Sequence, residues 1–473
     1  MQSDVEALYK LSATEIVAMR RRRELSATDL VEASINRIEQ VDGTVNAIPI
    51  RCFEQALDTA RRHDSSTADA DLLQGLPIAV KDYNDLEGVE TTYGSPVFAN
   101  NIATESDITV AQLQRNGAIA VGKSNVPEWA GGHTFNPVFG ATRNPWNPAL
   151  SAGGSSGGSA AALATGQVWL ATGNDLGGSL RTPASFNGVV GLRPGPGVVP
   201  GPLRYQPHDV LWVEGPMGRC VSDVALMLDA SAGKHIGDPL SFEPTGESFQ
   251  QFIHNHKSPA RVAFSEDLGI VPMSREVADV CRAGAEMFSS LGAEVTEDAP
   301  DFTGALEGFQ TLRALLVATM MGPLLEQHRH NITPEIVGNI EKGLALRVED
   351  IMEAERIRRD LYHRMATFFE SHDYLICPAA SITPFPVEQR YVEEIEGKPC
   401  DTYIDWFAIT FAITMTSCPT ISLPCGFSKD GMPIGMQIVG KPRGEAELLR
   451  DAYQLEQTLG MSASVPIDPR TAP

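Results

Sequence analysis

Short apolar segments alternate with helical segments along most of the chain, and this alternation is the strongest constraint on its fold. The segment GLPIAVKD is followed by the helical pattern SDITVAQLQRNG and then by the strand-like AIAVG. Farther along, RVAFSE, SREVADVCRAGAEMFSSLG and AEVTE repeat the same order. Strand–helix–strand units place parallel strands in one sheet with helices on its faces. We therefore predict an α/β fold with a central mixed, mainly parallel sheet that helices cover on both faces.

Helical periodicity is clearest in two parts of the chain. In SATDLVEASINRIEQV, Ser26 or Thr28 can cap a helix whose apolar face carries Leu30, Val31, Ile35 and Ile38. After Ser274, apolar residues from Val277 to Leu291 recur at helical spacing, and Gly292 supplies the stop. No repeat and no long low-complexity linker divides the 473 residues. One large domain over residues 1–473 is therefore favoured over two.

The charge balance limits the partners of the protein. Lys and Arg number 37 against 60 Asp and Glu, which gives a formal net charge of −23. Such a chain repels phosphate backbones and anionic lipid headgroups, so neither nucleic acid nor a membrane is expected as a partner. No apolar stretch is expected to reach the roughly 18 to 20 residues of a membrane span. The first residues, MQSDVEALYKLSATE, show no secretory signal.

The seven cysteines are odd in number and scattered, which is typical of free, buried thiols in a reducing compartment. Together with the absence of a signal, this predicts a cytoplasmic protein. No H-E-x-x-H motif and no Cys/His cluster with metal-ligand spacing occurs, so no metal is expected.

Two motifs suggest chemistry that their context does not support. Residues 117–124, GAIAVGKS, match the phosphate-binding loop, but a helix precedes them and Pro127 follows too soon for a helix start. The stretch SAGGSSGGS contains G-x-S-x-G twice, around Ser155 and Ser156. A nucleophile elbow needs a buried strand before the serine, whereas the residues here are RNPWNPALSA.

Three side chains remain in unusual settings. Lys81 ends the apolar run LPIAV, where an ammonium group is costly unless it is exposed, paired or neutral. By itself it would be interpreted as a strand-end lysine that reaches solvent. Ser155 lies in a glycine-rich segment directly before the helix former SAAALATG. Ser179 ends NDLGGS, whose glycines can turn several N–H groups toward one point, as an oxyanion hole requires.

These segments resemble the amidase signature family. The resemblance rests on GLPIAVKD, on NPWNPALSAGGSSGGSAAALATG and on GNDLGGSLRTPASFNGVVGLRP, with PTISLPCGFSKDGMPIGMQIVG near the C-terminus. It implies that residues 65–215 form the catalytic core and that residues 405–455 supply its closing strands and helix. Residues 1–64 would be a helical N-terminal segment. Residues 225–400 match loosely and would be a variable, helix-rich part that shapes the substrate pocket.

The resemblance also implies a triad in which Ser179 is the nucleophile, Ser155 the bridging serine after a cis peptide bond and Lys81 the base. A serine hydroxyl must lose its proton to a base as it attacks, and burial would lower the pKa of Lys81 toward neutrality, as this role needs. Residues 176–179 carry the implied oxyanion-hole N–H groups, namely those of Leu176, Gly177, Gly178 and Ser179.

Further roles follow from the same resemblance. Asp175, Arg181 and Ser156 would support the catalytic loops, although charged residues beside such a turn also have purely structural uses. In EWAGGHTF, the residues expected to face the substrate are Trp129, Ala130, Gly131 and His133, and core packing is an equally ordinary use for Trp129. Many family members carry threonine or serine before the aspartate, whereas this chain has Asn174.

The resemblance leaves three functions open. The first is a stand-alone hydrolase of small amides, with esters and carbamates (urethanes) as further substrates, acting without a cofactor and either as one chain or as a homodimer. The second is the glutaminase (A) subunit of a tRNA-dependent amidotransferase, although that subunit typically reads closer to SDTGGSIRQPA than to NDLGGSLRTPA. The third, an idle binding module, is weak because all three triad positions are filled.

Overall fold

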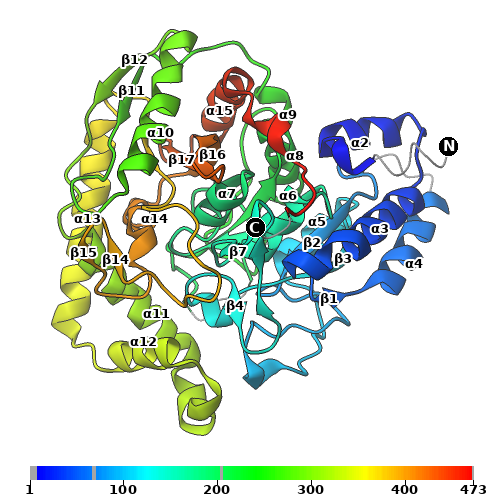
Figure 1. Cartoon of the computed structure of the whole chain (residues 1–473), viewed down its shortest axis with the longest axis horizontal. Coiled ribbons are helices and arrows are strands. Elements are labelled where there is room, and N and C mark those ends of the chain that lie inside the picture. Colours follow the sequence, from blue (N-terminus) through cyan, green and yellow to red (C-terminus); the bar gives the residue numbers. More distant parts are fainter. Residues whose placement is uncertain (1–7, 66–70, 203–205, 471–473) are drawn as a thin grey trace.

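One sheet of eleven strands runs through the whole molecule in the computed structural model, which describes residues 8–65, 71–202 and 206–470 (Figure 1). Parts of the predicted segments 1–64 and 65–215 fall in the gaps and lie outside the described residues. The strands, in the order in which they neighbour one another, are β1 (Ile50–Arg51), β3 (Ile119–Ser124), β2 (Pro77–Lys81), β8 (Leu170–Asp175), β10 (Val213–Gly218), β9 (Val190–Arg193), β16 (Thr420–Phe427), β17 (Pro433–Val439), β13 (Tyr374–Pro378), β11 (Arg261–Phe264) and β12 (Glu294–Glu297).

The sheet is mixed, as predicted, but its parallel pairs are confined to two blocks. β3, β2 and β8 are parallel neighbours, and so are β13, β11 and β12. Between these blocks, β8, β10, β9, β16, β17 and β13 pair in antiparallel fashion, and β1 is antiparallel to β3. The prediction of mainly parallel pairing was therefore too strong. The reason is that β16 and β17 form a hairpin, which a pattern of alternating strands and helices does not reveal.

Helices flank this sheet along its length. They are α2 (Ala13–Arg21), α3 (Ala27–Val45), α4 (Phe53–Ser65), α5 (Ile108–Arg115), α6 (Gly157–Ala164), α7 (Arg181–Asn187), α8 (Val221–Ser231), α9 (Phe249–Phe252), α10 (Arg275–Glu286), α11 (Ala305–His328), α12 (Pro334–Leu344), α13 (Val348–Phe368), α14 (Ala408–Thr414) and α15 (Glu445–Leu459). Three small ribbons add β4 (Phe135–Asn136) with β5 (Gly140–Ala141), β6 (Arg143–Asn144) with β7 (Asn147–Ser151), and β14 (Glu394–Ile395) with β15 (Lys398–Pro399).

The two helices predicted in detail form where their capping residues indicate. The Ser26 hydroxyl oxygen accepts from the Asp29 N–H, and the Asp29 carboxylate accepts from the Ser26 N–H, so of the two candidates Ser26 is the cap of α3. Helix α10 begins after Ser274, tightens into a 3₁₀ turn at Met287–Leu291, and ends at Gly292, whose φ is +91°.

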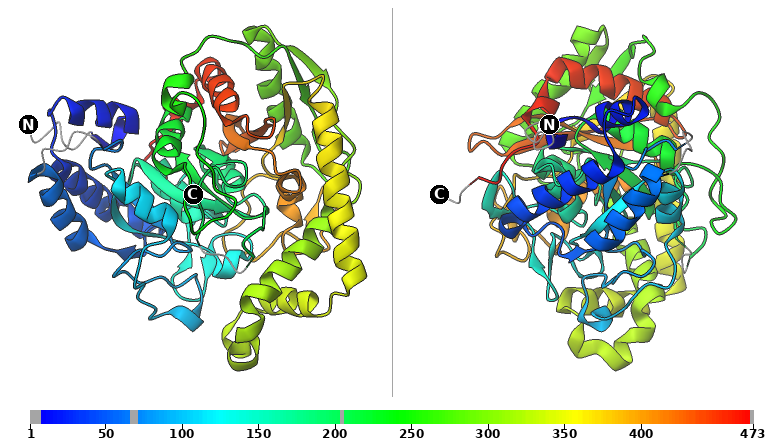
Figure 2. Two further views of the ribbon diagram at one scale, coloured as in Figure 1. Left: turned by 180° about the vertical axis from the view of Figure 1, so that it is seen from behind. Right: turned by 90° about the vertical axis from the view of Figure 1, so that its right-hand side faces the viewer.

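The N-terminal helices and the long helices α11–α13 lie at opposite ends of the molecule (Figures 1 and 2). Ala305–Asn331 comprises α11 and the 3₁₀ turn Arg329–Asn331 that follows it. By length and composition alone it is long and apolar enough to span a membrane, with a mean hydropathy of 1.2. The expectation that no segment reaches this length was therefore wrong. In this structure α11 packs along α12 and α13, and 44% of its most apolar window is buried.

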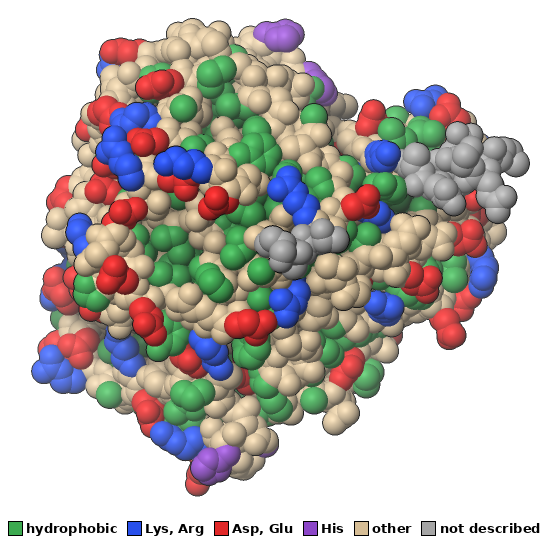
Figure 3. All heavy atoms as spheres, viewed as in Figure 1, with side chains coloured by type: hydrophobic (Ala, Val, Ile, Leu, Met, Phe, Trp, Pro, Cys, Tyr) green, Lys and Arg blue, Asp and Glu red, His purple; other side chains and the backbone are tan. Residues whose placement is uncertain are grey.

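The charges on the face seen in Figure 3 are dispersed. Acidic and basic side chains alternate there over both ends of the molecule. The excess of negative charge is therefore not gathered in a single patch on this face.

Candidate active site

Lys81 lies at the end of strand β2, in the interior of the sheet, and the whole residue is buried. Its ammonium donates hydrogen bonds to Ser155 Oγ at 2.8 Å, to Ser156 Oγ at 2.8 Å and to Asn174 Oδ1 at 2.6 Å. The solvent-reaching lysine that the local sequence favours is thus absent. Instead, three polar side chains converge on Nζ, two from the turn before α6 and one from strand β8.

The surroundings of Lys81 favour its neutral form. Burial lowers its pKa to about 7, while the negative charges of Glu214 and Asp175 act in the opposite direction. A large fraction of the amine is therefore unprotonated near neutral pH, and a neutral amine can accept a proton.

Ser155 and Ser156 belong to the turn between ribbon strand β7 and helix α6. The peptide bond between Gly154 and Ser155 is cis, which is the conformation that the family resemblance implies. A side chain at Gly154 has no room, because its Cβ would lie 2.4 Å from the carbonyl oxygen of Gly132. The loop expected to face the substrate therefore packs directly on the peptide bond that presents Ser155.

Ser179 follows β8 in a tight turn that leads into α7. It lies beside the other serines, because the Ser156 N–H donates to its carbonyl oxygen at 3.3 Å. Its hydroxyl, however, makes no hydrogen bond to that of Ser155 in the described chain. Catalytic hydrogen bonds are often long in an unliganded enzyme and shorten when substrate binds.

The turn requires glycine at position 178. Gly178 has φ +128°, and a Cβ there would lie 2.1 Å from Thr410 Oγ1. Its N–H donates to Asp175 Oδ1 at 2.8 Å, so it is occupied and we omit it from the expected oxyanion hole. Within the described chain, no hydrogen bond is donated by the N–H groups of Leu176, Gly177 and Ser179.

Asp175 and Arg181 hold this turn from beneath. Arg181 binds the Asp175 carboxylate with two nitrogens, at 3.0 and 2.9 Å, and both side chains are fully buried. Burial would raise the pKa of Asp175, but the charges of Arg181 and Arg193 outweigh it and lower the pKa well below its usual range. Arg181 also donates to Thr410 O and Gln437 Oε1, which ties the turn to α14 and β17.

The segment that contains Trp129, Ala130 and Gly131 adopts an unusual backbone. Trp129 and Ala130 have positive φ angles of 50° and 61°. The Trp129 ring stacks on Tyr93 at 5.7 Å and packs in the apolar cluster around α11 and α12, so core packing is part of its role. Its indole Nε1 is buried without a hydrogen-bond partner.

His133 and Asn174 each carry an unpaired buried nitrogen near the serines. His133 Nδ1 and Asn174 Nδ2 have no partner, and their residues are 3% and 2% exposed. Burial, reinforced by Arg390, lowers the pKa of His133 to about 4, so this ring is neutral at physiological pH. Buried polar atoms without partners are costly, and a bound substrate is one means of satisfying them.

Sequence reasoning did not identify Glu214. Its carboxylate accepts from Asn84 Nδ2 at 3.0 Å and from Trp212 Nε1 at 2.8 Å, and Asn84 is bridged to the Lys81 backbone through Thr172. Because Glu214 is distant in sequence and lies in no motif, only its pairing opposite Asn174 in the sheet brings it near Lys81.

Sequence reasoning also did not identify the role of Lys123. The segment GAIAVGKS is the buried strand β3, and the ammonium of Lys123 binds Asp82 Oδ1 at 3.0 Å instead of a phosphate. The available signal was that Lys123, like Lys81, follows an apolar run, and the two runs form neighbouring strands.

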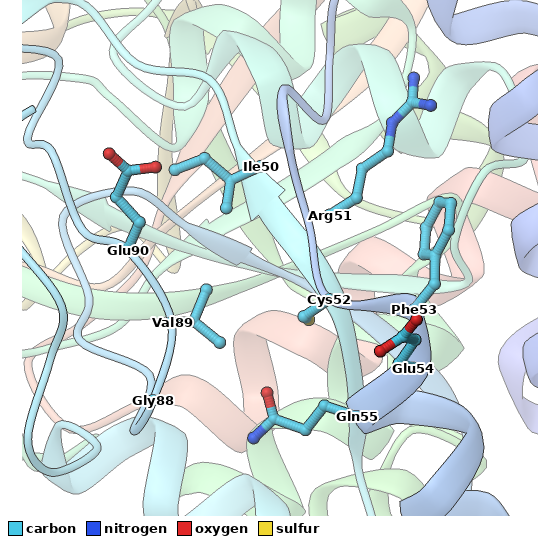
Figure 4. A pocket seen from close by; sticks show the side chains of 9 residues that line it. All are labelled: Ile50, Arg51, Cys52, Phe53, Glu54, Gln55, Gly88, Val89 and Glu90. Atoms are coloured by element: carbon cyan, nitrogen blue, oxygen red, sulfur yellow. The ribbon is translucent and has the colours of Figure 1, made fainter. Parts of the chain in front are cut away.

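A hollow of about 630 Å³ lies at the edge strand β1. It is lined by residues 50–55 and 88–90, and Figure 4 shows Arg51 extending away from Glu90. No triad residue lines it. Among the residues that the structure describes, no group of three or more His, Cys, Asp or Glu side chains could hold a metal ion, and the cysteines are free.

Comparison with known proteins agrees with this geometry. Residues 29–449 match the Amidase family. The chain is 34% identical over 469 residues to an acylamidase of Rhodococcus erythropolis, covering 98% of each chain. It is 33% identical over 479 residues to the A subunit of the glutamyl-tRNA(Gln) amidotransferase of Moorella thermoacetica, covering 95% of this chain and 97% of that one.

Solved structures give the same result. A bacterial aryl acylamidase of the amidase signature family has a TM-score of 0.89 at 25% identity, covering 97% of this chain and 99% of its own. A 6-aminohexanoate cyclic dimer hydrolase has a TM-score of 0.87 at 28% identity, with 98% and 99% covered. The chain therefore belongs to the amidase signature family, and it is an amidase.

Proposed function

We propose that this amidase cleaves carboxylic amides through an acyl-enzyme on Ser179, with Ser155 and Lys81 as its proton relay. The observation that carries the proposal is the contact of 2.8 Å between Lys81 Nζ and Ser155 Oγ, made by a lysine whose pKa burial lowers to about 7. A lysine with an ordinary pKa would be almost fully protonated at neutral pH and could not act as a base.

The proton moves in two steps during attack. Ser179 Oγ bonds to the substrate carbonyl carbon while its proton passes to Ser155 Oγ, and the Ser155 proton passes to neutral Lys81. The carbonyl oxygen becomes an oxyanion, which the unoccupied N–H groups of Leu176, Gly177 and Ser179 stabilise. Ser155 then returns a proton to the departing nitrogen as the C–N bond breaks, and water hydrolyses the acyl-enzyme.

The relatives support a small acyl amide as substrate. Both an acylamidase and an aryl acylamidase are similar to the chain over nearly their whole length. Esters and carbamates fit the same chemistry, because their carbonyl also becomes a tetrahedral oxyanion. We propose both as side activities of a small-molecule enzyme that needs neither cofactor nor metal.

A glutaminase component of an amidotransferase complex is the second candidate. Its specific support is the 33% identity to the amidotransferase chain of Moorella thermoacetica. The two candidates differ in whether the chain works alone. Turnover of a simple anilide by the purified chain, without added partners, would favour the hydrolase, whereas turnover that requires a partner would favour the amidotransferase component.

The proton relay is tested by comparing an anilide with a phenyl ester of the same acid. An amine anion is a very poor leaving group, whereas a phenolate leaves without a proton. Ser155→Ala should therefore lower kcat/KM for the anilide by several powers of ten and for the ester far less. Ser179→Ala should abolish turnover of both substrates. An unchanged anilide-to-ester ratio in Ser155→Ala would remove Ser155 from leaving-group protonation.

A further inference from the structure

A nearly buried guanidinium lies beside the predicted site without a carboxylate partner. Arg313 on α11 is 4% exposed, and its side chain donates one hydrogen bond, to the phenol oxygen of Tyr403. The Tyr403 ring centre lies 5.3 Å from the guanidinium carbon. Within the described ranges Arg313 forms no ion pair. Since a guanidinium has five N–H donors and buried charges are normally paired, most of its binding capacity is unused.

Two neighbours one helical turn away on α11 locate Arg313 relative to the site. Residues four apart share a face of a helix, so Phe309 and Val317 flank Arg313. A Cβ on Gly177 would lie 2.9 Å from Phe309 Cζ, which places that ring against the Ser179 turn. Val317 packs in the apolar cluster that also includes Trp129. Arg313 therefore lies between the nucleophile turn and Trp129.

Tyr403, the hydrogen-bond partner of Arg313, also locates Arg313 relative to the site. A Cβ on Gly132 would lie 3.7 Å from Tyr403 Cδ2, so the phenol borders the loop that packs on the Gly154–Ser155 bond. Burial and neighbouring charges, among them that of Tyr403, raise the pKa of Tyr83, whose ring centre is 4.9 Å from Lys81 Nζ. Tyr403 thus holds Arg313 on the side of the protein that faces the lysine and the serines.

The local charge around Arg313 is positive. Lys342 on α12 lies near Arg313. Burial lowers the pKa of Lys342, the positive charge of Arg313 lowers it further, and the negative charge of Asp405 acts in the opposite direction. Two cations with one opposing carboxylate leave a site that attracts an anion.

We propose that Arg313 binds a carboxylate of the substrate, so that this amidase prefers amides bearing a negative charge on the acyl part or on the leaving amine. The inference rests on the proposed function, because it takes the pocket beside Ser179 as the place where the amide binds. An arginine binds a carboxylate through two parallel hydrogen bonds, which fixes the orientation of the substrate as well as its charge.

The test uses two matched pairs of anilides. N-phenylsuccinamic acid and N-phenylpentanamide place or omit a carboxylate on the acyl part, and 4-acetamidobenzoic acid and 4′-methylacetanilide do so on the amine. For at least one pair, the native protein should favour the anion in kcat/KM. Arg313→Gln should reduce that preference by about tenfold to a hundredfold, the range expected for a charged hydrogen bond.

Two further variants separate recognition from folding. Arg313→Lys keeps the charge and should retain part of the preference, with a thermal transition close to that of the native protein. Arg329→Gln removes an equally charged side chain from the exposed end of the same helix, where it pairs with Glu341, and should leave the preference unchanged. The proposal is overturned if the native protein hydrolyses these anilides without preferring the anion in either pair, or if Arg313→Gln lowers the rates for both members of a pair equally.

Binding measured without turnover separates this inference from the proposed function. Calorimetric titration of Ser179→Ala with each member of a pair should show tighter binding of the anion, and Arg313→Gln in that background should abolish the difference. If the native protein hydrolyses no anilide but Ser179→Ala still binds the anion more tightly, the proposed reaction fails and the anion site stands. Equal binding of both members would remove the anion site whatever the rates.

Discussion

Asn174 is the residue at which the nucleophile segment departs from the family pattern, and it contacts Lys81 directly. Its side-chain oxygen Oδ1 accepts from Lys81 Nζ at 2.6 Å, while its side-chain nitrogen Nδ2 is buried without a partner. A threonine or serine at this position would present a shorter side chain and a hydroxyl that can donate as well as accept. Asn174 thus contributes to the position of the lysine.

The pH dependence of the reaction tests this contact. In the native protein kcat/KM should rise with pH through a pKa near 7, because only neutral Lys81 accepts a proton. Asn174→Asp places a carboxylate against Nζ and stabilises the ammonium, so the rise should move to higher pH by about 1 to 3 units. Asn174→Ser, which adds no charge, should keep the rise within about one unit of its native position. Identical profiles for the native protein and Asn174→Asp would contradict the assignment of Lys81 as base.

At the scale of the elements, the buried pair of Asp175 and Arg181 joins the end of β8 to the start of α7. Arg181 also reaches α14 and β17, so one side chain connects four elements around the nucleophile turn. Removing one partner of a buried pair leaves the other charge without compensation, and this costs more than the pair itself contributes.

We therefore expect Arg181→Met to lower the free energy of unfolding by about 3 to 5 kcal/mol, measured by chemical denaturation. Arg261→Met is the matched control, since Arg261 pairs with Glu294 on the exposed edge of the sheet. That variant should lose at most about 1 kcal/mol. Equal losses in both variants would show that the buried pair does not stabilise the turn.

At the scale of the whole molecule, a second buried cluster fastens the N-terminal helices to the rest of the chain. Arg219 donates to the carbonyl oxygens of Tyr9 and Leu11, and Asp223 on α8 accepts from the Thr14 N–H at 3.1 Å. Glu456 on α15 accepts from the Val221 N–H at 2.9 Å. Burial, with a smaller contribution from Asp223, raises the pKa of Glu456 to about 8.

This raised pKa makes stability fall with rising pH. In the folded protein Glu456 stays protonated up to about pH 8, whereas in the unfolded chain it ionises near 4.5. The contribution of Glu456 to the free energy of unfolding is fully present below pH 4.5. It is lost between pH 4.5 and 8, by at most about 1.4 kcal/mol per pH unit. Glu456→Gln should therefore gain thermal stability relative to the native protein as pH rises from 5 to 8. The exposed Glu447→Gln on the same helix should show no such gain.

The sequence by itself determined the family, the mixed α/β architecture and the start of α10 after Ser274, and it limited the cap of α3 to Ser26 or Thr28. These depend on local features, namely the period of apolar residues, capping side chains and glycine-rich turns, which act within a few residues of one another. The candidate triad followed from the resemblance of three segments to the amidase signature family.

Only the tertiary structure decided the surroundings of those residues. The antiparallel centre of the sheet, the carboxylate of Glu214 opposite Asn174 and the guanidinium of Arg313 beside the nucleophile turn join residues far apart in the chain. The pKa of Lys81 likewise depends on its complete burial and on charges from other strands. Burial and long-range contact are properties of the packed molecule, so a motif can indicate which residue is the base, whereas its protonation is set by the fold.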